Sequence, residues 1–326
     1  MREIKKIVFL GNFSVPYCTE VHHARTYEKL GIEVIRMQEG VVTADQLISA
    51  VVHADAFCWT HTHSWRTEGI EGVLALCKER GIPSYGYHLD LWLGIEREKD
   101  LENDPFWRVE HFFSVDPEMV DLLNSKEYLP KGYFLPAGVF EDECYRAEAN
   151  REKYPHDVIF VGSRGYHPEW PYRAMLIEWL ENTYGSRFAQ YGGGGLGTIR
   201  GHELNVLYAS AKVVVGDTLC PNFTKPYYLS DRIFETTGRG GMMIHPYIKG
   251  IEGMFKCYPF GEDAVESSEV AVYDYKDFDM LEFRINHLLQ DDVLREGIRW
   301  NGFERTKREH TYTQRLTQLL EVLRNV

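Results

Sequence analysis

The sequence lacks the features that mark several specialised classes of protein. Its 36 basic side chains stand against 49 acidic ones, a net charge of −13, and this deficit of positive charge disfavours non-specific binding to nucleic acids and to anionic membrane surfaces. No stretch reaches the roughly 18 apolar residues of a membrane span. The apolar run after the basic start, MREIKK, is too short for a signal peptide and is typical of a first strand. We therefore expect a cytoplasmic protein without a membrane span.

The cysteines also lack the spacing of a redox or zinc motif. Six are present and none belongs to a CxxC pair, so we expect reduced and mostly buried thiols. They are Cys18, Cys58, Cys77, Cys144, Cys220 and Cys257.

Strand-like and helix-like segments alternate along the 326 residues, which predicts parallel sheets covered by helices. The expected strands are 6–10, 33–37, 54–60, 83–88, 133–140, 157–161, 187–191, 212–215 and 242–245. The expected helices are 19–30, 43–53, 67–80, 171–184, 202–211 and 230–237, with a helical tail over 280–326.

The length fits two domains. The charged segment 141–156 reads as the linker between them. We expect an α/β protein with two Rossmann-like βα domains facing across a cleft. Residues 1–150 form the first domain, and residues 151–326, with closing C-terminal helices, form the second.

Two familiar nucleotide-binding fingerprints are missing. The turn GSRG, Gly162 to Gly165, has no third glycine at GxGxxG spacing, and the run GGGGLG, Gly192 to Gly197, is not followed by GK[ST]. Gly162, Ser163 and Arg164 nevertheless follow a predicted strand and can bring backbone N–H groups and a positive charge to a phosphate. The alternative is a plain turn. The glycine run is either a mobile surface loop or one that closes on a ligand.

The segment SDRIFETTGRGG, Ser230 to Gly241, carries the clearest functional pattern. On a helix, Ser230 and Asp231 cap the N-terminus, and Arg232 lies in the first turn, where the helix dipole also favours an anion. Glu235, one turn on, can accept hydrogen bonds from a ribose diol. A nucleoside diphosphate fits this combination; the alternative is a capped helix with a solvated Arg–Glu pair. Asp217, which ends the preceding strand region, is placed with the same site.

This segment resembles the donor-binding segment of group-one GT-B glycosyltransferases, and most of all the CgeB-like branch, S-x-R-x-F-E-x-x-x-x-G. The segments DVIFVGS, LYASAKVVVGD and KREHTYTQRL match further, so the resemblance covers about half of the chain. It implies that Glu235 holds the donor ribose, and that Arg232 and Gly162–Arg164 face the diphosphate. Tyr227 stands where retaining relatives often carry a second Glu, which leaves sugar identity and stereochemistry open.

Polar residues that follow the N-terminal strands are candidates for the acceptor side. His88 and Asp90, in YHLDLW, are the catalytic candidates, with Asp90 either orienting His88 or acting as base; the alternative is that both bond the backbone. The acceptor-side candidates are Asn12, His61, His63 and Trp65. No third ligand accompanies His61 and His63, so we expect no metal site.

The leading hypothesis is transfer of a sugar from a nucleoside-diphosphate sugar, UDP-sugar foremost, to an acceptor hydroxyl without a further cofactor. The sequence is similar to phage-encoded glycosyltransferases, which makes a hydroxymethylated base of phage DNA one acceptor class, and a saccharide or small molecule the other. A nucleotide-sugar epimerase and a non-catalytic nucleotide-binding module are the alternatives. The oligomeric state is left open.

Overall fold

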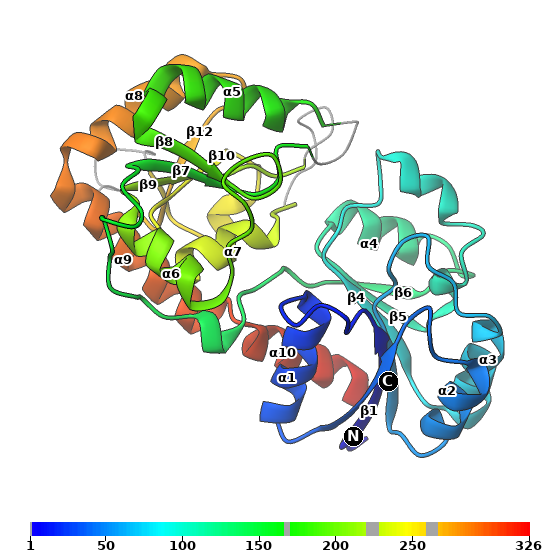
Figure 1. Ribbon diagram of the computed structural model, residues 1–326. Helices are drawn as coiled ribbons and strands as arrows, with labels where there is room; N and C mark the ends of the chain where they lie inside the picture. The colour runs from blue at the N-terminus through cyan, green and yellow to red at the C-terminus, as the bar shows by residue number, and fades with distance from the viewer. Residues whose placement is uncertain (1, 166–169, 220–227, 259–266) are drawn as a thin grey trace. The chain divides into compact units, whose positions relative to one another are not determined.

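The chain forms two compact units in a computed structural model that describes residues 2–165, 170–219, 228–258 and 267–326. Unit 1 comprises Met1–Phe140 and Tyr312–Val326, and unit 2 comprises Glu141–Thr311 (Figure 1). We expected one boundary near residue 150 and all C-terminal helices in the second half. Instead the chain leaves unit 1 at Phe140 and returns to it with its last helix.

Unit 1 contains a six-stranded parallel sheet in the order β2-β1-β3-β4-β5-β6. Its strands are β1 (Lys6–Gly11), β2 (Glu33–Gln38), β3 (Ala56–Trp59), β4 (Ser84–His88), β5 (His111–Ser114) and β6 (Lys131–Phe134). Its helices are α1 (Thr19–Lys29), α2 (Ala44–Val51), α3 (Ile70–Arg80), α4 (Pro117–Asn124) and α10 (Tyr312–Arg324), with 3-10 turns η1 (Glu96–Asp100) and η2 (Pro105–Arg108).

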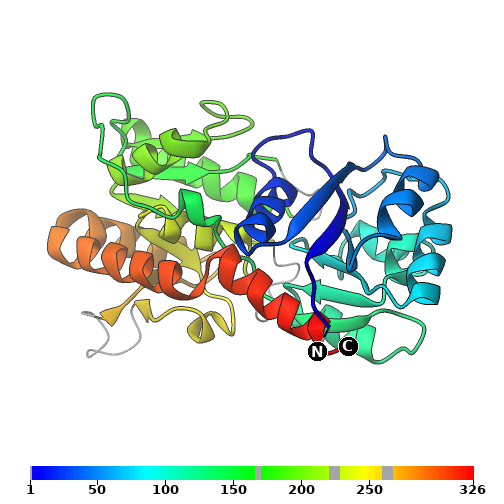
Figure 2. The same cartoon turned by 90° about the horizontal axis from the view of Figure 1, so that it is seen from below.

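Alternation along β1 sends side chains into two separate cores. Ile7 and Phe9 pack with α1 and α10, whereas Val8 and Leu10 pack with α2, α3 and α4. The C-terminal helix α10 lies against α1, and the Arg2 N–H donates to the Arg324 carbonyl at 3.0 Å, so the two termini lie side by side (Figure 2). The last helix therefore completes the core that the first strand begins.

Unit 2 repeats the architecture with the strand order β11-β12-β10-β9-β7-β8, again parallel. Its strands are β7 (Val158–Val161), β8 (Phe188–Tyr191), β9 (Val213–Val215), β10 (Met243–Pro246), β11 (Cys257–Tyr258) and β12 (Val270–Tyr273). Its helices are α5 (Tyr172–Tyr184), α6 (Gly201–Ser210), α7 (Asp231–Gly238), α8 (Phe278–Gln290) and α9 (Asp292–Glu309), with turns η3 (Glu141–Glu143), η4 (Gly185–Arg187) and η6 (Ile251–Gly253). Helices α5 and α8 cover one face, and α6, α7 and α9 cover the other (Figure 1).

Most of the expected elements are confirmed to within a few residues, and the misses are short ones. Strand β5 was not predicted, because four residues between aromatic turns are too few to show a period. Strand β6 spans Lys131–Phe134, so it overlaps only the start of the strand and turn that we expected over 133–140. Strands β11 and β12 were also missed.

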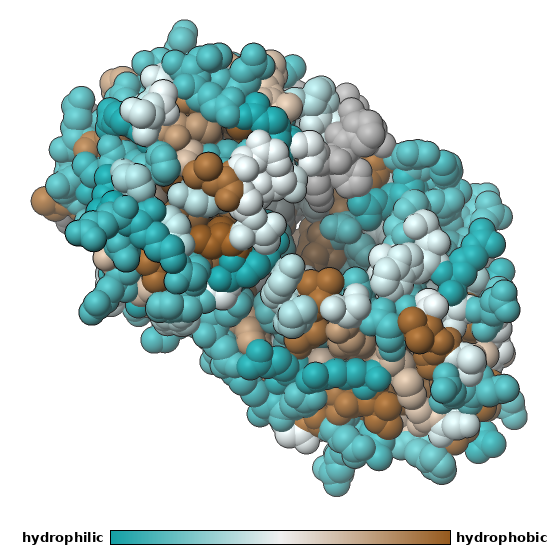
Figure 3. All heavy atoms as spheres, in the orientation of Figure 1, coloured by the Kyte–Doolittle hydropathy of each residue, from teal (hydrophilic) through white to brown (hydrophobic). Residues whose placement is uncertain are grey.

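The thiols behave largely as expected: Cys58, Cys77, Cys144 and Cys257 are buried, Cys18 is half-buried, and none of these five forms a disulfide. Cys220 lies outside the described residues. Among the described residues, no helix combines the length and apolarity needed to cross a bilayer. On the face drawn in Figure 3, each unit's surface is mainly hydrophilic with separate hydrophobic patches.

Because α10 belongs to unit 1, Leu319→Ala should destabilise that unit. The Leu319 side chain is fully buried in the core shared with α1, and such a truncation costs about 2–5 kcal/mol. Urea unfolding should show the lower free energy of unfolding, and hydrogen exchange should show faster exchange of the amides of β1 and α1. Gln318→Ala, an exposed change on the same helix, is the control; equal losses for the two variants would contradict the assignment.

Candidate functional site

The strand order in unit 2 changes direction between β7 and β9, and open parallel sheets bind ligands at such a switch point. A hollow of about 90 Å³ lies at the carboxyl ends of these two strands. Five of the predicted donor residues line it together. They are Gly162, Asp217, Ser230, Asp231 and Arg232. The other lining residues are Phe160, Val161, Arg173, Gly216, Leu219 and Tyr228.

The Asp217 carboxylate forms the buried floor of this arrangement. Its Oδ2 accepts hydrogen bonds from Trp170 Nε1 at 2.9 Å and Arg173 Nε at 3.0 Å. Burial raises the pKa of Asp217, although the Arg173 charge opposes the rise. Trp170 precedes α5 and Arg173 lies in its first turn, so Asp217 Oδ2 holds Arg173 at the hollow, while Asp217 Oδ1 has no hydrogen-bond partner among the described residues.

The N-terminus of α7 supplies the opposite wall. Ser230 occupies the N-cap position, but its hydroxyl makes no capping hydrogen bond and finds no partner among the described residues. Arg232 Nη1 lies 2.9 Å from Glu235 Oε2, with both side chains less than a quarter exposed. The pair is therefore partly buried, and the fully solvated pair that we weighed as the alternative does not form.

Three further residues take positions away from the hollow. Arg164 pairs with Glu181 of α5, and Ser163 does not line the hollow. Arg239, the second arginine of the glycine-rich segment, is 2% exposed and donates to Asn205 Oδ1 at 2.6 Å and to Glu143. Arg239 therefore stabilises the fold.

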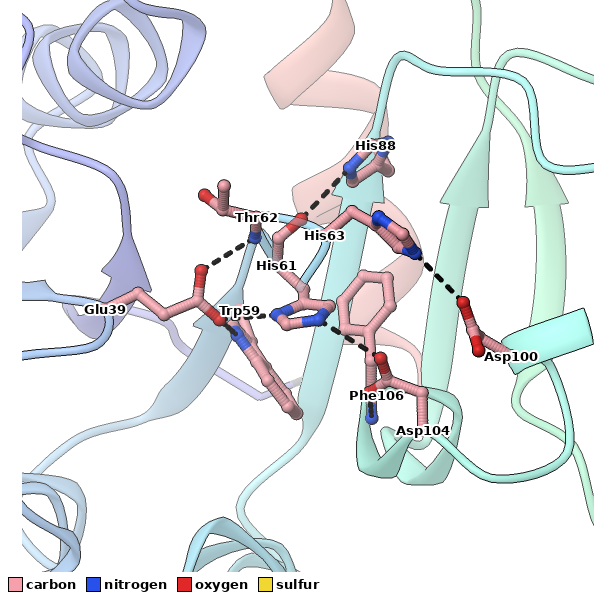
Figure 4. A network of polar contacts seen from close by, with 9 residues as sticks. All are labelled: Glu39, Trp59, His61, Thr62, His63, His88, Asp100, Asp104 and Phe106. Carbon is pink, nitrogen blue, oxygen red and sulfur yellow. Dashed lines mark hydrogen bonds and ion pairs between the residues drawn. The ribbon is translucent and has the colours of Figure 1, made fainter. Parts of the chain in front are cut away.

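In unit 1, a buried carboxylate organises the loop after β3 (Figure 4). Glu39 directly follows β2 and is 1% exposed. It accepts hydrogen bonds from Trp59 Nε1 at 2.7 Å, His61 Nδ1 at 2.6 Å and the Thr62 N–H at 2.7 Å. The buried Glu39 carboxylate thus holds the loop that begins at Thr60 in place.

His61 links this loop to the segment after η1. Its Nε2 lies 3.1 Å from Asp104 Oδ2, so both ring nitrogens face carboxylates and both donate. Burial lowers the pKa of His61, but the two carboxylates outweigh it and raise the pKa to about 9. The imidazolium is therefore the stable form at neutral pH, and it has no lone pair with which to act as a base.

The expected orientation of His88 by Asp90 does not form. His88 Nε2 donates to the His61 carbonyl at 3.2 Å, and its Nδ1 accepts from the Asp90 N–H at 3.2 Å. Burial lowers the pKa of His88, so the ring is neutral and both nitrogens bond the backbone. The Asp90 carboxylate is 4.0 Å from His88 Nδ1 and 3.1 Å from Arg97 Nη1. At 45% side-chain exposure, Asp90 is the more accessible candidate.

The remaining acceptor-side candidates differ in exposure. Asn12 Oδ1 accepts from the Ser14 N–H and hydroxyl at 3.1 and 2.6 Å, which shapes its own turn. His63 is 45% exposed and lies 2.9 Å from Asp100 Oδ2. Trp65 is half-buried beside Gly40. All three follow a strand at the carboxyl edge, and His63 is the exposed one, whereas Asn12 and Trp65 are half-buried.

Sequence reasoning missed Glu39, Asp104 and Arg173. Glu39 carried a signal, because an acid directly after a strand falls at the ligand-binding edge of a parallel sheet. Arg173 carried a weaker signal, because it is a cation in the first turn of α5, the helix that follows β7. Asp104 carried none, since its partner His61 is 43 residues away.

Comparison with known proteins agrees with this architecture. Residues 173–321 match the family model described as glycosyl transferase-like. An α-glucosyltransferase in complex with UDP and a 13-mer DNA containing a HMU base has a TM-score of 0.72 at 12% identity, covering 99% of this chain and 100% of that one. Anabaena HepE in complex with UDP and glucose has a TM-score of 0.66 at 12% identity, covering 99% of this chain and 100% of that one. A glycosyltransferase from Rickettsia africae has a TM-score of 0.64 at 10% identity, covering 99% of each chain.

The fold is GT-B. This confirms the predicted α/β class with two Rossmann-like units. A search of curated proteins finds no match to the sequence, and the CgeB-like resemblance stays a prediction. Tyr227 and residues 166–169 lie outside the described residues. Within the described residues, no group of three side chains is arranged to hold a metal ion.

The charge of His61 should make stability depend on pH. A histidine with a raised pKa stabilises the fold fully below its unfolded value of about 6.5, and that contribution is lost as pH rises through about 9. The interval spans about 2.5 pH units, so we expect a loss on the order of 3.5 kcal/mol at about 1.4 kcal/mol per unit. Thermal unfolding of wild type and His61→Asn from pH 6 to 10 measures it; parallel profiles would refute the buried imidazolium.

Proposed function

We propose that this protein is a glycosyltransferase that moves a sugar from a nucleoside-diphosphate sugar to an acceptor hydroxyl. The observation that carries the proposal is the hollow at the carboxyl ends of β7 and β9. Two guanidinium groups, Arg173 and Arg232, and the N-terminus of α7 meet there. Guanidinium groups and a helix N-terminus are both suited to a diphosphate.

The chemistry follows from what these groups stabilise. A bond forms between the acceptor oxygen and the anomeric carbon while the bond from that carbon to the diphosphate breaks. The bonding electrons leave with the nucleoside diphosphate, and the acceptor proton passes to a base. Negative charge grows on the diphosphate as it leaves, so Arg173 and Arg232 stabilise the transition state more than the bound donor.

We propose UDP-sugar as the donor and Glu235 as the residue that holds its ribose. Solved structures of the same fold contain UDP, with glucose in Anabaena HepE and with DNA in the α-glucosyltransferase. Glu235 lies one turn beyond Arg232 and already bonds its guanidinium. One side chain would therefore orient the arginine for the diphosphate and accept the ribose hydroxyls.

On unit 1 we propose Asp90 as the base. His61 is held as an imidazolium and His88 uses both nitrogens on the backbone. Asp90 follows β4 directly with a carboxylate that is 45% exposed, and it pairs with Arg97. His63 and Trp65 are proposed to contact the acceptor.

Two acceptor classes remain proposals, and they draw on different observations. The likeness to an α-glucosyltransferase bound to DNA containing a HMU base supports a hydroxymethylated base. The charge of unit 1 supports a saccharide or another neutral hydroxyl compound. Residues 96–110, which follow β4, carry six acidic and three basic side chains, and two of those bases are paired with Asp90 and Glu96. A phosphate backbone needs cations there, so the charge favours the saccharide class.

The donor site is tested by Arg232→Gln. The guanidinium is proposed to make charge-assisted hydrogen bonds to the diphosphate, each worth about 1.5–3 kcal/mol, so the UDP dissociation constant should rise roughly 10- to 100-fold. Isothermal titration with UDP measures this. Arg187→Gln, which removes an exposed arginine paired with Asp157 at the opposite edge of the sheet, should bind UDP like wild type.

Asp90→Asn is the matched variant on unit 1, which should bind UDP normally and lose turnover.

Three outcomes would contradict or redirect the proposal. Unchanged UDP affinity in Arg232→Gln would contradict the donor site. Release of free UDP with acceptor present distinguishes a transferase from an epimerase, and binding without any turnover would indicate a nucleotide-binding module.

The acceptor class is tested by salt dependence. With UDP-glucose as donor, we expect transfer to a saccharide panel whose rate changes less than about twofold between 50 and 200 mM NaCl, because neutral acceptors release no counterions. A DNA acceptor would lose affinity steeply over the same range. Release of UDP with a duplex containing 5-hydroxymethyluracil, falling with salt, would overturn the saccharide preference and establish the DNA class.

A further inference from the structure

The two glycine-rich segments of unit 2 lie directly on each other. Strands β7 and β8 are neighbours in register, so the turn after β7 and the loop after β8 emerge side by side. The Gly162 N–H donates to the Tyr191 carbonyl at 2.7 Å, and the Arg164 N–H donates to the Gly193 carbonyl at 2.8 Å. We weighed the glycine run as a mobile surface loop or as one that closes on a ligand. Residues 193–197 are exposed at the surface, and the start of the run is hydrogen-bonded to the turn.

This packing explains why the loop is built from glycines. At Gly192, which has φ +129°, a Cβ atom would lie 2.4 Å from the Gly162 carbonyl oxygen. At Gly195 it would lie 2.3 Å from Gln190 Oε1. Both approaches are impossible for any other residue without moving backbone or the buried amide. The run is therefore shaped to fit the turn and the side chain of Gln190.

Gln190 is the polar residue that joins the two segments. It lies in the buried strand β8 and is 4% exposed. Its Nε2 donates to the Gly162 carbonyl at 2.5 Å and to the Gly193 carbonyl at 3.1 Å. An amide at a buried strand position costs free energy unless it is hydrogen-bonded. These two carbonyls satisfy Nε2 of Gln190, while Oε1 has no hydrogen-bond partner among the described residues.

We propose that Gln190 is a positioning residue for the donor diphosphate, an inference that rests on the proposed function. By holding the Gly162 carbonyl, Gln190 fixes the plane of the peptide that joins Gly162 to Ser163. In a trans peptide the N–H points opposite to the carbonyl, so the Ser163 N–H is directed away from Gln190. Gly162 lines the hollow beside Arg232, and Ser163 is the next residue along the chain, outside that lining. In this proposal the Ser163 N–H, with its direction fixed through the Gly162 carbonyl, is the donor for a phosphate oxygen.

The test is nucleotide affinity in Gln190→Leu, a variant that keeps the bulk of the side chain and removes the amide. With UDP as the first probe and GDP, ADP and dTDP as alternatives, we expect the dissociation constant to rise roughly 5- to 20-fold, measured well below the melting temperature. Thr306→Val is the control for lost stability alone. Thr306 lies on α9, and the variant removes the buried hydrogen bond of 2.7 Å between its hydroxyl and the hydroxyl of Thr237. It should lower the melting temperature and leave nucleotide affinity unchanged.

Gln190→Glu adds a signature that a purely structural role would not give. An ionised carboxylate would face two carbonyl oxygens, so burial and repulsion raise its pKa, and only the protonated form can donate to one of them. The ratio of its dissociation constant to that of wild type should therefore fall towards one as pH is lowered from 8 to 5.5.

The outcomes separate the two proposals. Equal affinity of wild type and Gln190→Leu, or a loss matched by Thr306→Val, would overturn the role of Gln190 while leaving the donor site intact. A wild-type protein that binds none of the four nucleotides would overturn the proposed function, and this inference with it.

Discussion

In both units the order of the parallel strands reverses beside the first strand, and this reversal decides which distant segments meet. Connections on the two sides of the reversal pass over opposite faces of the sheet, so the loops diverge and leave room at the carboxyl edge. In unit 2 this places the turn after β7, the end of β9 and the start of α7 around one hollow. In unit 1 the same edge carries Glu39, His61 and Asp90. The candidate chemistry of each unit depends on this single topological constraint.

Buried charge is used differently at the two edges. In unit 2 the buried Asp217 carboxylate accepts hydrogen bonds from Trp170 and Arg173, which fixes the position of the Arg173 guanidinium at the hollow. In unit 1 an imidazolium is held between Glu39 and Asp104, and it ties together loops that no backbone ladder joins. Taking such groups out of water is costly, and hydrogen bonds and opposite charges offset part of that cost. The hollow in unit 2 is lined by two arginines and two aspartates, whereas residues 96–110 of unit 1 carry more acidic than basic side chains.

The two glycine-rich segments of unit 2 also have different structural roles. The segment around Gly240 permits close packing near Arg146 and ends the helix that carries Arg232. The run from Gly192 to Gly197 instead lets one loop lie on another, with Gln190 joining them. Hydrogen bonds join this loop to the turn at Gly162, and the shape of that turn depends on them.

The sequence by itself determined the class of fold and the segment that carries the donor candidates. Alternating periods predicted nearly every long element, and Ser230, Asp231 and Arg232 were predicted together because they are neighbours on one helix turn. The structure decided everything that depends on residues far apart in the chain. It paired His61 with Asp104, it directed both nitrogens of His88 to the backbone, it assigned α10 to unit 1, and it turned Arg239 inward. Local spacing records helix faces and strand alternation, whereas long-range pairing is set by the order of the strands, which a single sequence does not display.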